Sequence, residues 1–515
     1  MIRLELDVAQ TRLAQAVAHR GAARYRDALE LLEGCEDWHS PHAERGVLLR
    51  ATILSRTKPL ESLAILARCQ DLFESDEARF GYCVVSMRDY IVTRNFDAAS
   101  EMAVKAEALA DRVPAPQRST LWYQHALLAY CLGNYDTNHA GIRRLLENSD
   151  PNGRFLGYLT RAYMHASRQC YDEQTSDLIA AVDVALNYPG ECDPALLAVQ
   201  VHALLRLGLE RGHREAVAKA ADAVEVLPWT DDLRGEHFLC VRALAWDAFL
   251  RGDAVQAQWM LKDSKALAVS DAWKVMAHLD RAYIARMNGN EYWAAEDLAA
   301  AHAIARDVEW GSTAGEERQA LVMLAVLYSP TDMARAQEYV SLYVQLGREN
   351  LNPMLQAAHD QRSVAFEQYA LGRVQQVLGN EELAAASFRR AYDIFDAARY
   401  HFRAALCALG LYESSSEADW RQKAREHADH FPNSALCATL AHKTAATDDE
   451  RFRDLTPMQR QVVLALCEGL DLAQMSQRFS RSAFTLAKHV ETIYGHFGVK
   501  NRHGLRAAMG RRQLV

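Results

Sequence analysis

The feature that most constrains the fold is a turn motif that recurs along the first 440 residues. Its clearest copy is LGRVQQVLGNEELAAASFRRA, residues 371–391, in which Gly372 precedes the turn glycine Gly379 by seven residues. Glycine adopts the left-handed conformation that ends a helix, and Ala384 and Phe388 then lie on one face of the helix that follows. The segment therefore predicts two helices that approach each other closely at Gly372.

Weaker copies of this turn recur upstream, most of them 37–40 residues apart. They stand near Tyr25, Arg94, Gly133, Gly212, Gly252 and Gly289. The interval of 79 residues between Gly133 and Gly212 predicts one more unit near Tyr171, and Pro330 marks another turn. In spacing, these copies resemble the tetratricopeptide repeat. The resemblance implies about ten or eleven helix pairs in residues 1–440, stacked as an α-solenoid superhelix with a concave surface that binds a partner. Seven of its nine tryptophans are expected to pack in the core: Trp122, Trp229, Trp246, Trp259, Trp273, Trp293 and Trp310.

Composition favours an all-α fold and excludes several classes of protein. Only 25 glycines and 12 prolines occur in 515 residues, which argues against a turn-rich β protein. No apolar stretch has the length of a membrane span, and the N-terminus lacks the pattern of a signal peptide. The ten cysteines form no C-x-x-C pair, and no catalytic or phosphate-binding motif occurs. We therefore expect a cytoplasmic protein that is not an enzyme and that has no metal and no cofactor.

Charge is distributed unevenly along the chain. The last 65 residues contain 11 Lys and Arg against 4 Asp and Glu, whereas the first 450 contain 47 against 63. An acidic body with a short basic end is a pattern of nucleic-acid-binding modules attached to another domain. The acidic part could also fold back on the basic end and restrain it.

The basic end, residues 455–515, follows a linker at 441–454 and predicts four short helices. The first begins with a capping box, in which Thr456 is followed three residues later by Gln459, and it ends at Gly469. The third runs from Ala483 to about Phe497, with Leu486, Val490, Ile493 and Phe497 on its inner side. The N-cap residues are, in order, Thr456, Asp471, Ser482 and Asn501. The second and third helices, joined by a tight turn, predict a helix-turn-helix.

Motifs at fixed spacing make this segment similar to the LuxR-type DNA-binding domain. The matching residues are Leu455-Thr456-Pro457, Gly469, the run Ser482, Thr485 and His489, and the closing Gly498, Val499, Asn501 and Arg502. The resemblance covers about a tenth of the chain and implies that the third helix enters the major groove of double-stranded DNA. It also implies a homodimer, formed by the fourth helix or by the solenoid, with RNA polymerase as a further candidate partner. The P-loop of the ATP-dependent members is absent from this sequence.

The resemblance assigns DNA contacts residue by residue. Base contacts fall on Leu486, Ala487, Lys488 and Glu491, and phosphate contacts fall on Arg481, Ser482, Thr485, His489, Lys500, Asn501, Arg502 and Arg506. The family usually has lysine where Ala487 stands, and Glu491 places a negative charge beside phosphates. These two departures put the base contacts in doubt.

The sequence thus leaves two functions open. The first is a transcriptional regulator whose helical-repeat domain senses a ligand, peptide or protein and controls a C-terminal helix-turn-helix. The second is a solenoid adaptor or sequestering protein whose last domain contacts another protein instead of DNA. Steep salt dependence of binding would favour the first, because neutralised phosphates release counterions.

Overall fold

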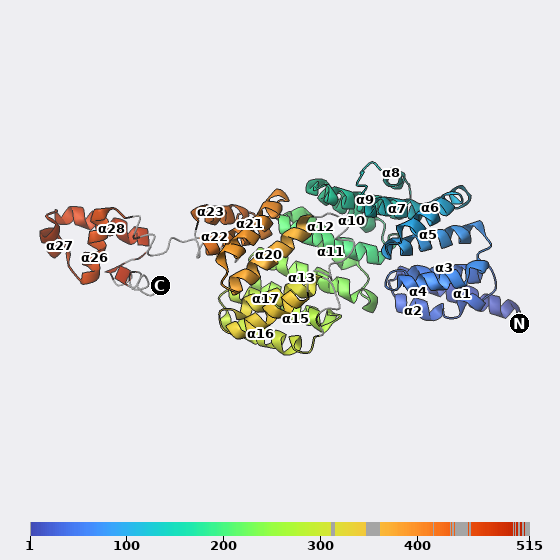
Figure 1. The fold of residues 1–515 in the computed structure, drawn as a ribbon, viewed down its shortest axis with the longest axis horizontal. Helices are drawn as coiled ribbons and strands as arrows, with labels where there is room; N and C mark the ends of the chain where they lie inside the picture. The colour runs from blue at the N-terminus through green and yellow to red at the C-terminus, as the bar shows by residue number, and fades with distance from the viewer. Residues whose placement is uncertain are drawn as a thin grey trace. The chain divides into compact units, whose positions relative to one another are not determined.

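The computed structural model describes most of the chain, and its described part is all-helical (Figure 1). The described residues are 2–308, 310, 315–346, 361–415, 417–432, 434, 437, 452, 455–497, 499, 501, 502, 505, 506 and 509. None of them lies in a β-strand, which confirms the predicted fold class. The chain divides into two compact units, Met1–Leu436 and Cys437–Val515. Within the described residues, no helix is long and apolar enough to cross a membrane.

The first unit is a tetratricopeptide-like α-solenoid built from helix pairs. Eleven pairs are present in its described part, each packed within itself and against the next. They are α1 (Ile2–Gly21) with α2 (Tyr25–Leu31), α3 (His42–Leu54) with α4 (Pro59–Arg68), α5 (Asp76–Val92) with α6 (Phe96–Glu107), α7 (Ala115–Cys131) with α8 (Ala140–Leu146), α9 (Pro151–Ser167) with α10 (Tyr171–Asn187), α11 (Pro194–Arg211) with α12 (Arg214–Val226), α13 (Arg234–Leu250) with α14 (Ala254–Ser264), α15 (Asp271–Met287) with α16 (Glu291–Ala305), α17 (Gly315–Tyr328) with α18 (Met333–Gln345), α20 (Gln361–Val377) with α21 (Glu381–Ala397), and α22 (His401–Ser415) with α23 (Ala418–Ala428).

Most of the turns inside the pairs contain one residue in the left-handed conformation. Positive φ angles of 61–92° occur at the predicted turns, at Arg94, Gly133, Gly212, Gly252, Gly289 and Gly379. The unit predicted near Tyr171 is α9 with α10, and its turn residue is Gln169, with φ of 61°. Pro330 lies between α17 and α18, as predicted. Because glycine and polar turn residues mark these positions locally, the repeat could be found from sequence alone.

The close approach predicted at Gly372 is confirmed. A Cβ atom on Gly372 would lie 2.6 Å from Cε1 of Phe388, a distance that real Cβ atoms do not tolerate. On the other side of the same ring, a Cβ on Gly410 would lie 2.7 Å from Cε2. Two glycines from α20 and α22 therefore hold the buried ring of α21 between them.

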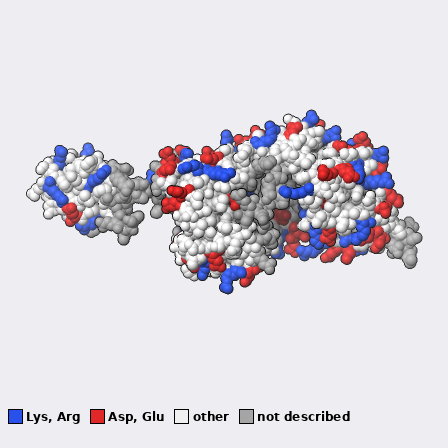
Figure 2. Space-filling model, in the orientation of Figure 1, with Lys and Arg blue, Asp and Glu red and all other residues white. Residues whose placement is uncertain are grey.

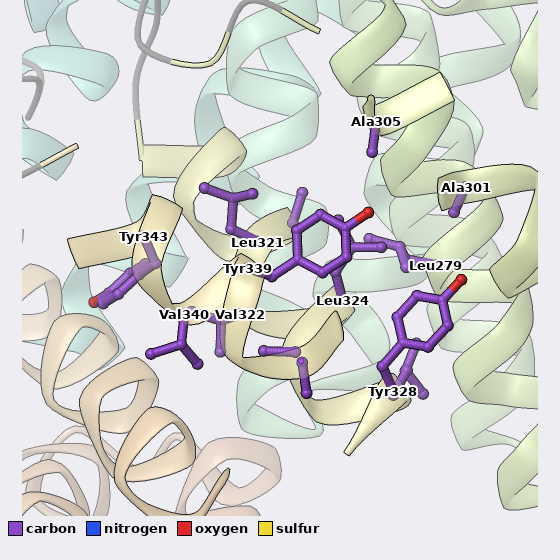
Figure 3. Packing of buried hydrophobic residues seen from close by; sticks show 14 of the residues in the cluster. Leu279, Ala301, Ala305, Leu321, Val322, Leu324, Tyr328, Tyr339, Val340 and Tyr343 are labelled. Atoms are coloured by element: carbon purple, nitrogen blue, oxygen red, sulfur yellow. The ribbon is translucent and has the colours of Figure 1, made fainter. Parts of the chain in front are cut away.

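Successive pairs share apolar cores. Figure 3 shows one such core, where Tyr328 at the end of α17 and Tyr339 on α18 lie near Leu324. The rings of Tyr328 and Tyr339 stack with centroids 6.2 Å apart, and the Tyr339 hydroxyl lies 2.6 Å from Nδ1 of His302. Each pair thus buries one face against its neighbour, as expected for a repeat array.

The solenoid is coiled so tightly that pairs distant in sequence meet. Arg56, in the turn between α3 and α4, pairs with Asp193, at 3.0 Å between Nη1 and Oδ1. Further along, α11 packs against α22, where Nε of Arg403 donates to Oε1 of Glu210 at 2.9 Å. The first contact joins residues that are 137 positions apart in the sequence, and the second joins residues 193 positions apart. Ion pairs between its turns therefore help to fix the superhelix.

The second unit is a small helical domain. Its helices are α26 (Pro457–Glu468), α27 (Leu472–Phe479) and α28 (Ala483–Phe497). The capping boxes that start α26 at Thr456 and α27 at Asp471 are both present. The core contains Val462, Val463, Leu466, Met475, Leu486, Ile493, Phe497 and Leu505. Most of the predicted fourth helix and nearly all of the predicted linker lie outside the described residues.

Candidate nucleic-acid interface

A three-residue turn sets the angle between α27 and α28. Ser480 ends α27 in the left-handed conformation, with φ of 52°. The hydroxyl of Ser476 donates to the carbonyl of Arg481 at 2.6 Å, and the Arg481 amide donates to the Ser476 carbonyl at 3.3 Å. The turn is thereby held at its base, and α28 leaves it in a fixed direction.

The N-terminus of α28 is capped as the sequence predicts. The Ser482 hydroxyl accepts a hydrogen bond from the Thr485 amide at 3.1 Å, and the hydroxyls of Ser482 and Thr485 are 2.8 Å apart. Both residues are exposed. The positive end of the α28 dipole therefore meets solvent beside two hydroxyl groups, which is a suitable environment for an anion.

The inner face of α28 forms the core of the unit. Leu486 and Ile493 are fully buried, and Phe497 is 3% exposed. The prediction that Leu486 contacts bases is therefore wrong. The resemblance placed it directly after Thr485, but its side chain packs with Val462 and Met475 in the core.

The outward face of α28 carries a stripe of three exposed residues, Phe484, Lys488 and Glu491. We call these three the outer stripe. They stand at i, i+4 and i+7, which brings them onto one side of a helix, opposite Leu486 and Ile493. Ala487 is only partly exposed and lies beside the stripe.

Sequence reasoning missed Phe484, whose side chain is 82% exposed. The helical period of the buried residues could have found it, because Phe484 precedes Lys488 by one turn on the side away from the core. An apolar residue on this helix was instead assigned no role.

Two predicted phosphate contacts have a structural role in this unit. Arg502 donates from Nη1 to the Gly469 carbonyl at 3.0 Å and from Nη2 to the Leu470 carbonyl. Arg506 donates from Nε to the Cys467 carbonyl at 2.8 Å. Both guanidinium groups thus satisfy carbonyls at the C-terminal end of α26, where a positive charge also interacts favourably with the helix dipole. The predicted phosphate contacts of Arg502 and Arg506 stay predictions beside this structural role.

The remaining predicted DNA contacts fall at different places in the second unit. Arg481 and Asn501 are exposed, His489 is partly exposed, and Lys500 lies outside the described residues. On the face of the second unit that Figure 2 shows, Lys and Arg predominate over Asp and Glu. The structure therefore brings together Arg481, Ser482, Thr485, Lys488 and Glu491, with Phe484 among them.

A second region of interest lies in the solenoid where α11 meets α20 and α22. The guanidinium groups of Arg206 and Arg403 lie 5.6 and 5.4 Å from the ring centroid of Phe366. Burial, together with Arg206 and Arg242, lowers the pKa of His202 to about 3. Two arginines, one from α11 and one from α22, thus lie close to an aromatic ring of α20, although α11 is far from α20 and α22 in the sequence.

The tryptophans of the solenoid only partly fit the prediction that they pack in the core. Trp246 contacts Phe249, Tyr283 and Phe402. Trp229 and Trp259 are both 58% exposed and Trp293 is 52% exposed, so for these three the prediction is wrong.

Comparison with solved structures gives distant matches. No protein-family model and no curated protein matches the chain. Among solved structures, a Rap protein complexed with Competence and Sporulation Factor is 12% identical and covers 78% of this chain and 99% of its own, with a TM-score of 0.39. The apo form of the quorum sensor NprR from B. thuringiensis is 12% identical over 76% of this chain and 99% of its own, with a TM-score of 0.40. At these values the matches carry no inference about function.

Proposed function

We propose that the protein is a DNA-binding transcriptional regulator, in which the solenoid senses a ligand, peptide or protein partner and controls the C-terminal helix-turn-helix. The observation that carries the proposal is the outer stripe of α28, which stands clear of the core beside a capped and exposed helix N-terminus. An α-helix fits the major groove, where base edges are distinguishable. An exposed helix on a unit whose visible face is rich in Lys and Arg supports this proposal.

The exposed residues divide between phosphate and base contacts. Arg481, Ser482 and Thr485 surround the N-terminus of α28 and would contact phosphates, which set position and affinity. Lys488 would donate to O6 and N7 of a guanine, and Glu491 would accept from N4 of a cytosine. Glu491, which departs from the family pattern, would thus contact a cytosine. A dimer would bind two half-sites about 10 base pairs apart.

The test is duplex selection from a random library with the full chain, followed by binding measurements at several salt concentrations. Arg481→Ala should weaken binding to all sequences and reduce the slope of log affinity against log salt by about 1. Lys488→Ala should cost about 1–3 kcal/mol and relax the preference at one base pair. Lys105→Ala on the solenoid removes the same charge and should change neither.

A signal that acts through the solenoid should change the dissociation constant for the selected duplex. We would screen short peptides and anionic small molecules in the same assay. The same assay would then use Arg206→Ala. If this variant binds the duplex normally without the signal but no longer responds to the signal, the signal binds near α11.

The opposing outcome is a chain that selects no duplex or binds it with little salt dependence. The adaptor function then becomes the better one, and the second unit offers a surface for it. A shallow hollow on this unit is lined mainly by apolar residues, among them Leu472, Val490 and Tyr494. A protein partner would be sought there by co-purification with the parent and with Leu472→Asp.

A further inference from the structure

We propose that Phe484 reads a thymine in the major groove through the C5-methyl group of the base. The inference rests on the proposed function and names a residue that determines specificity. Phe484 is the second residue of α28 and is 82% exposed, the largest fraction among the exposed large apolar side chains of the described residues. A phenyl ring kept in water at this position gives nothing to the stability of the unit.

Phe484 cannot be a misplaced core residue. It lies two positions before Leu486, which is about 200° around the helix, so its side chain points away from the buried face. That face is already filled by Leu486, Val490 and Ile493. The side chain of Phe484 is 82% exposed, so the described residues cover little of the ring, and a bound molecule would bury it.

The surroundings of the ring favour DNA as that molecule. Arg481 precedes it by three residues, Lys488 follows it by four, and both cations are exposed. The capped N-terminus of α28 adds the positive end of the helix dipole at the same place. An apolar ring with exposed cations three and four residues away along the chain suits a groove in which apolar methyl groups stand between two rows of phosphates.

The chemistry of the ring selects thymine among the bases. A phenyl group neither donates nor accepts a hydrogen bond, and thymine is the base that presents an apolar group, its methyl, at the major-groove edge. Four residues separate Phe484 from Lys488, a rise of about 6 Å along the helix, and base pairs are about 3.4 Å apart. The thymine should therefore lie within about two base pairs of the guanine that Lys488 reads.

The experiment replaces thymines of the selected duplex one at a time by deoxyuridine, which lacks only the methyl group. The full chain should lose about fourfold in affinity at one thymine, the factor that corresponds to burial of a single methyl-sized group. Phe484→Ala should bind the thymine duplex more weakly and should be indifferent to deoxyuridine at that position. Phe484→Leu should keep part of the discrimination. Leu464→Ala removes another exposed apolar side chain, 47% exposed on α26, and should behave as the parent.

The outcomes separate the inference from the proposed function. If the parent tolerates deoxyuridine at every thymine, or Phe484→Ala stays as sensitive as the parent, the inference is overturned, whereas the effect of Lys488→Ala on binding can stand. If the parent binds no duplex in a salt-dependent way, the proposed function fails first and the inference fails with it. Because Phe484 is exposed, its variants should retain the helical circular dichroism of the parent, and that measurement accompanies each titration.

Discussion

The ring of Phe388 between two glycines gives a sharp test of how the solenoid is packed. In Gly372→Ala, the new Cβ would lie 2.6, 2.7 and 2.9 Å from three atoms of this ring. The ring cannot move away, because its opposite edge already lies against Gly410. A Cβ atom on Gly410 would lie only 2.7 Å from Cε2 of Phe388. We therefore expect the substitution to destabilise the pairs formed by α20 to α23.

The magnitude follows from two opposing effects. Overpacking of a filled core costs about 1–3 kcal/mol, and the trapped ring places this site in the upper part of that range. Alanine in place of glycine within a helix restores up to about 1 kcal/mol. The net destabilisation should be about 1–2 kcal/mol, which is a factor of about 5–30 in the population of locally opened molecules.

Hydrogen exchange is the suitable assay, because repeat arrays open locally. Amides of α20, α21 and α22 should exchange about 5–30-fold faster in Gly372→Ala, and Gly372→Ala with Phe388→Leu should recover part of the protection. Gly21→Ala is the matched control, since nothing lies within 4 Å of its Cβ position. Unchanged protection in Gly372→Ala would refute the reasoning that the ring is held at both of its edges.

Three further predictions concern charged and titratable groups. Arg502→Ala should destabilise the second unit by about 1–3 kcal/mol, because it leaves the carbonyls at the end of α26 without a donor; unchanged exchange of α26 amides would contradict this. Asp280→Ala should destabilise α13 and α15 by roughly 3–5 kcal/mol, because Asp280 is fully buried and pairs with Arg242; a loss below 1 kcal/mol in urea unfolding would show that water replaces the carboxylate. Burial and the neighbours His430 and His427 lower the pKa of His401 from 6.5 to about 4, so the unfolded chain binds more protons in this window and stability should fall as the pH drops from about 6.5 towards 4. His401→Phe should reduce that loss, and an identical pH dependence of the urea midpoint would argue against it.

The sequence located what local chemistry fixes. Turns such as those at Gly212 and Gly379 could be placed because a left-handed residue favours glycine wherever it stands. The capping boxes at Thr456 and Asp471 were equally accessible, since a cap and its partner are three residues apart. The helix pairs of the solenoid and the start of each short helix in the second unit follow from such signals.

The candidate site was harder to derive, because exposure depends on which side of α28 packs inward. Leu486 was assigned to DNA by alignment although its period places it in the core, and Phe484 was passed over although the same period places it outside. Arg502 was predicted to contact phosphate because it is a cation in the motif. In the structure its hydrogen-bond acceptors are carbonyls more than 30 residues earlier in the chain. Nothing in the local sequence reveals such a partner.

The sequence by itself determined that the chain is helical, where its helix pairs turn, and that a basic segment with a helix-turn-helix pattern ends it. Only the tertiary structure decided how tightly the solenoid coils and which side chains remain exposed. The physical reason is range. Turn and cap signals act over three or four residues, whereas the pairs Arg56 with Asp193 and Arg403 with Glu210 depend on where distant helices meet.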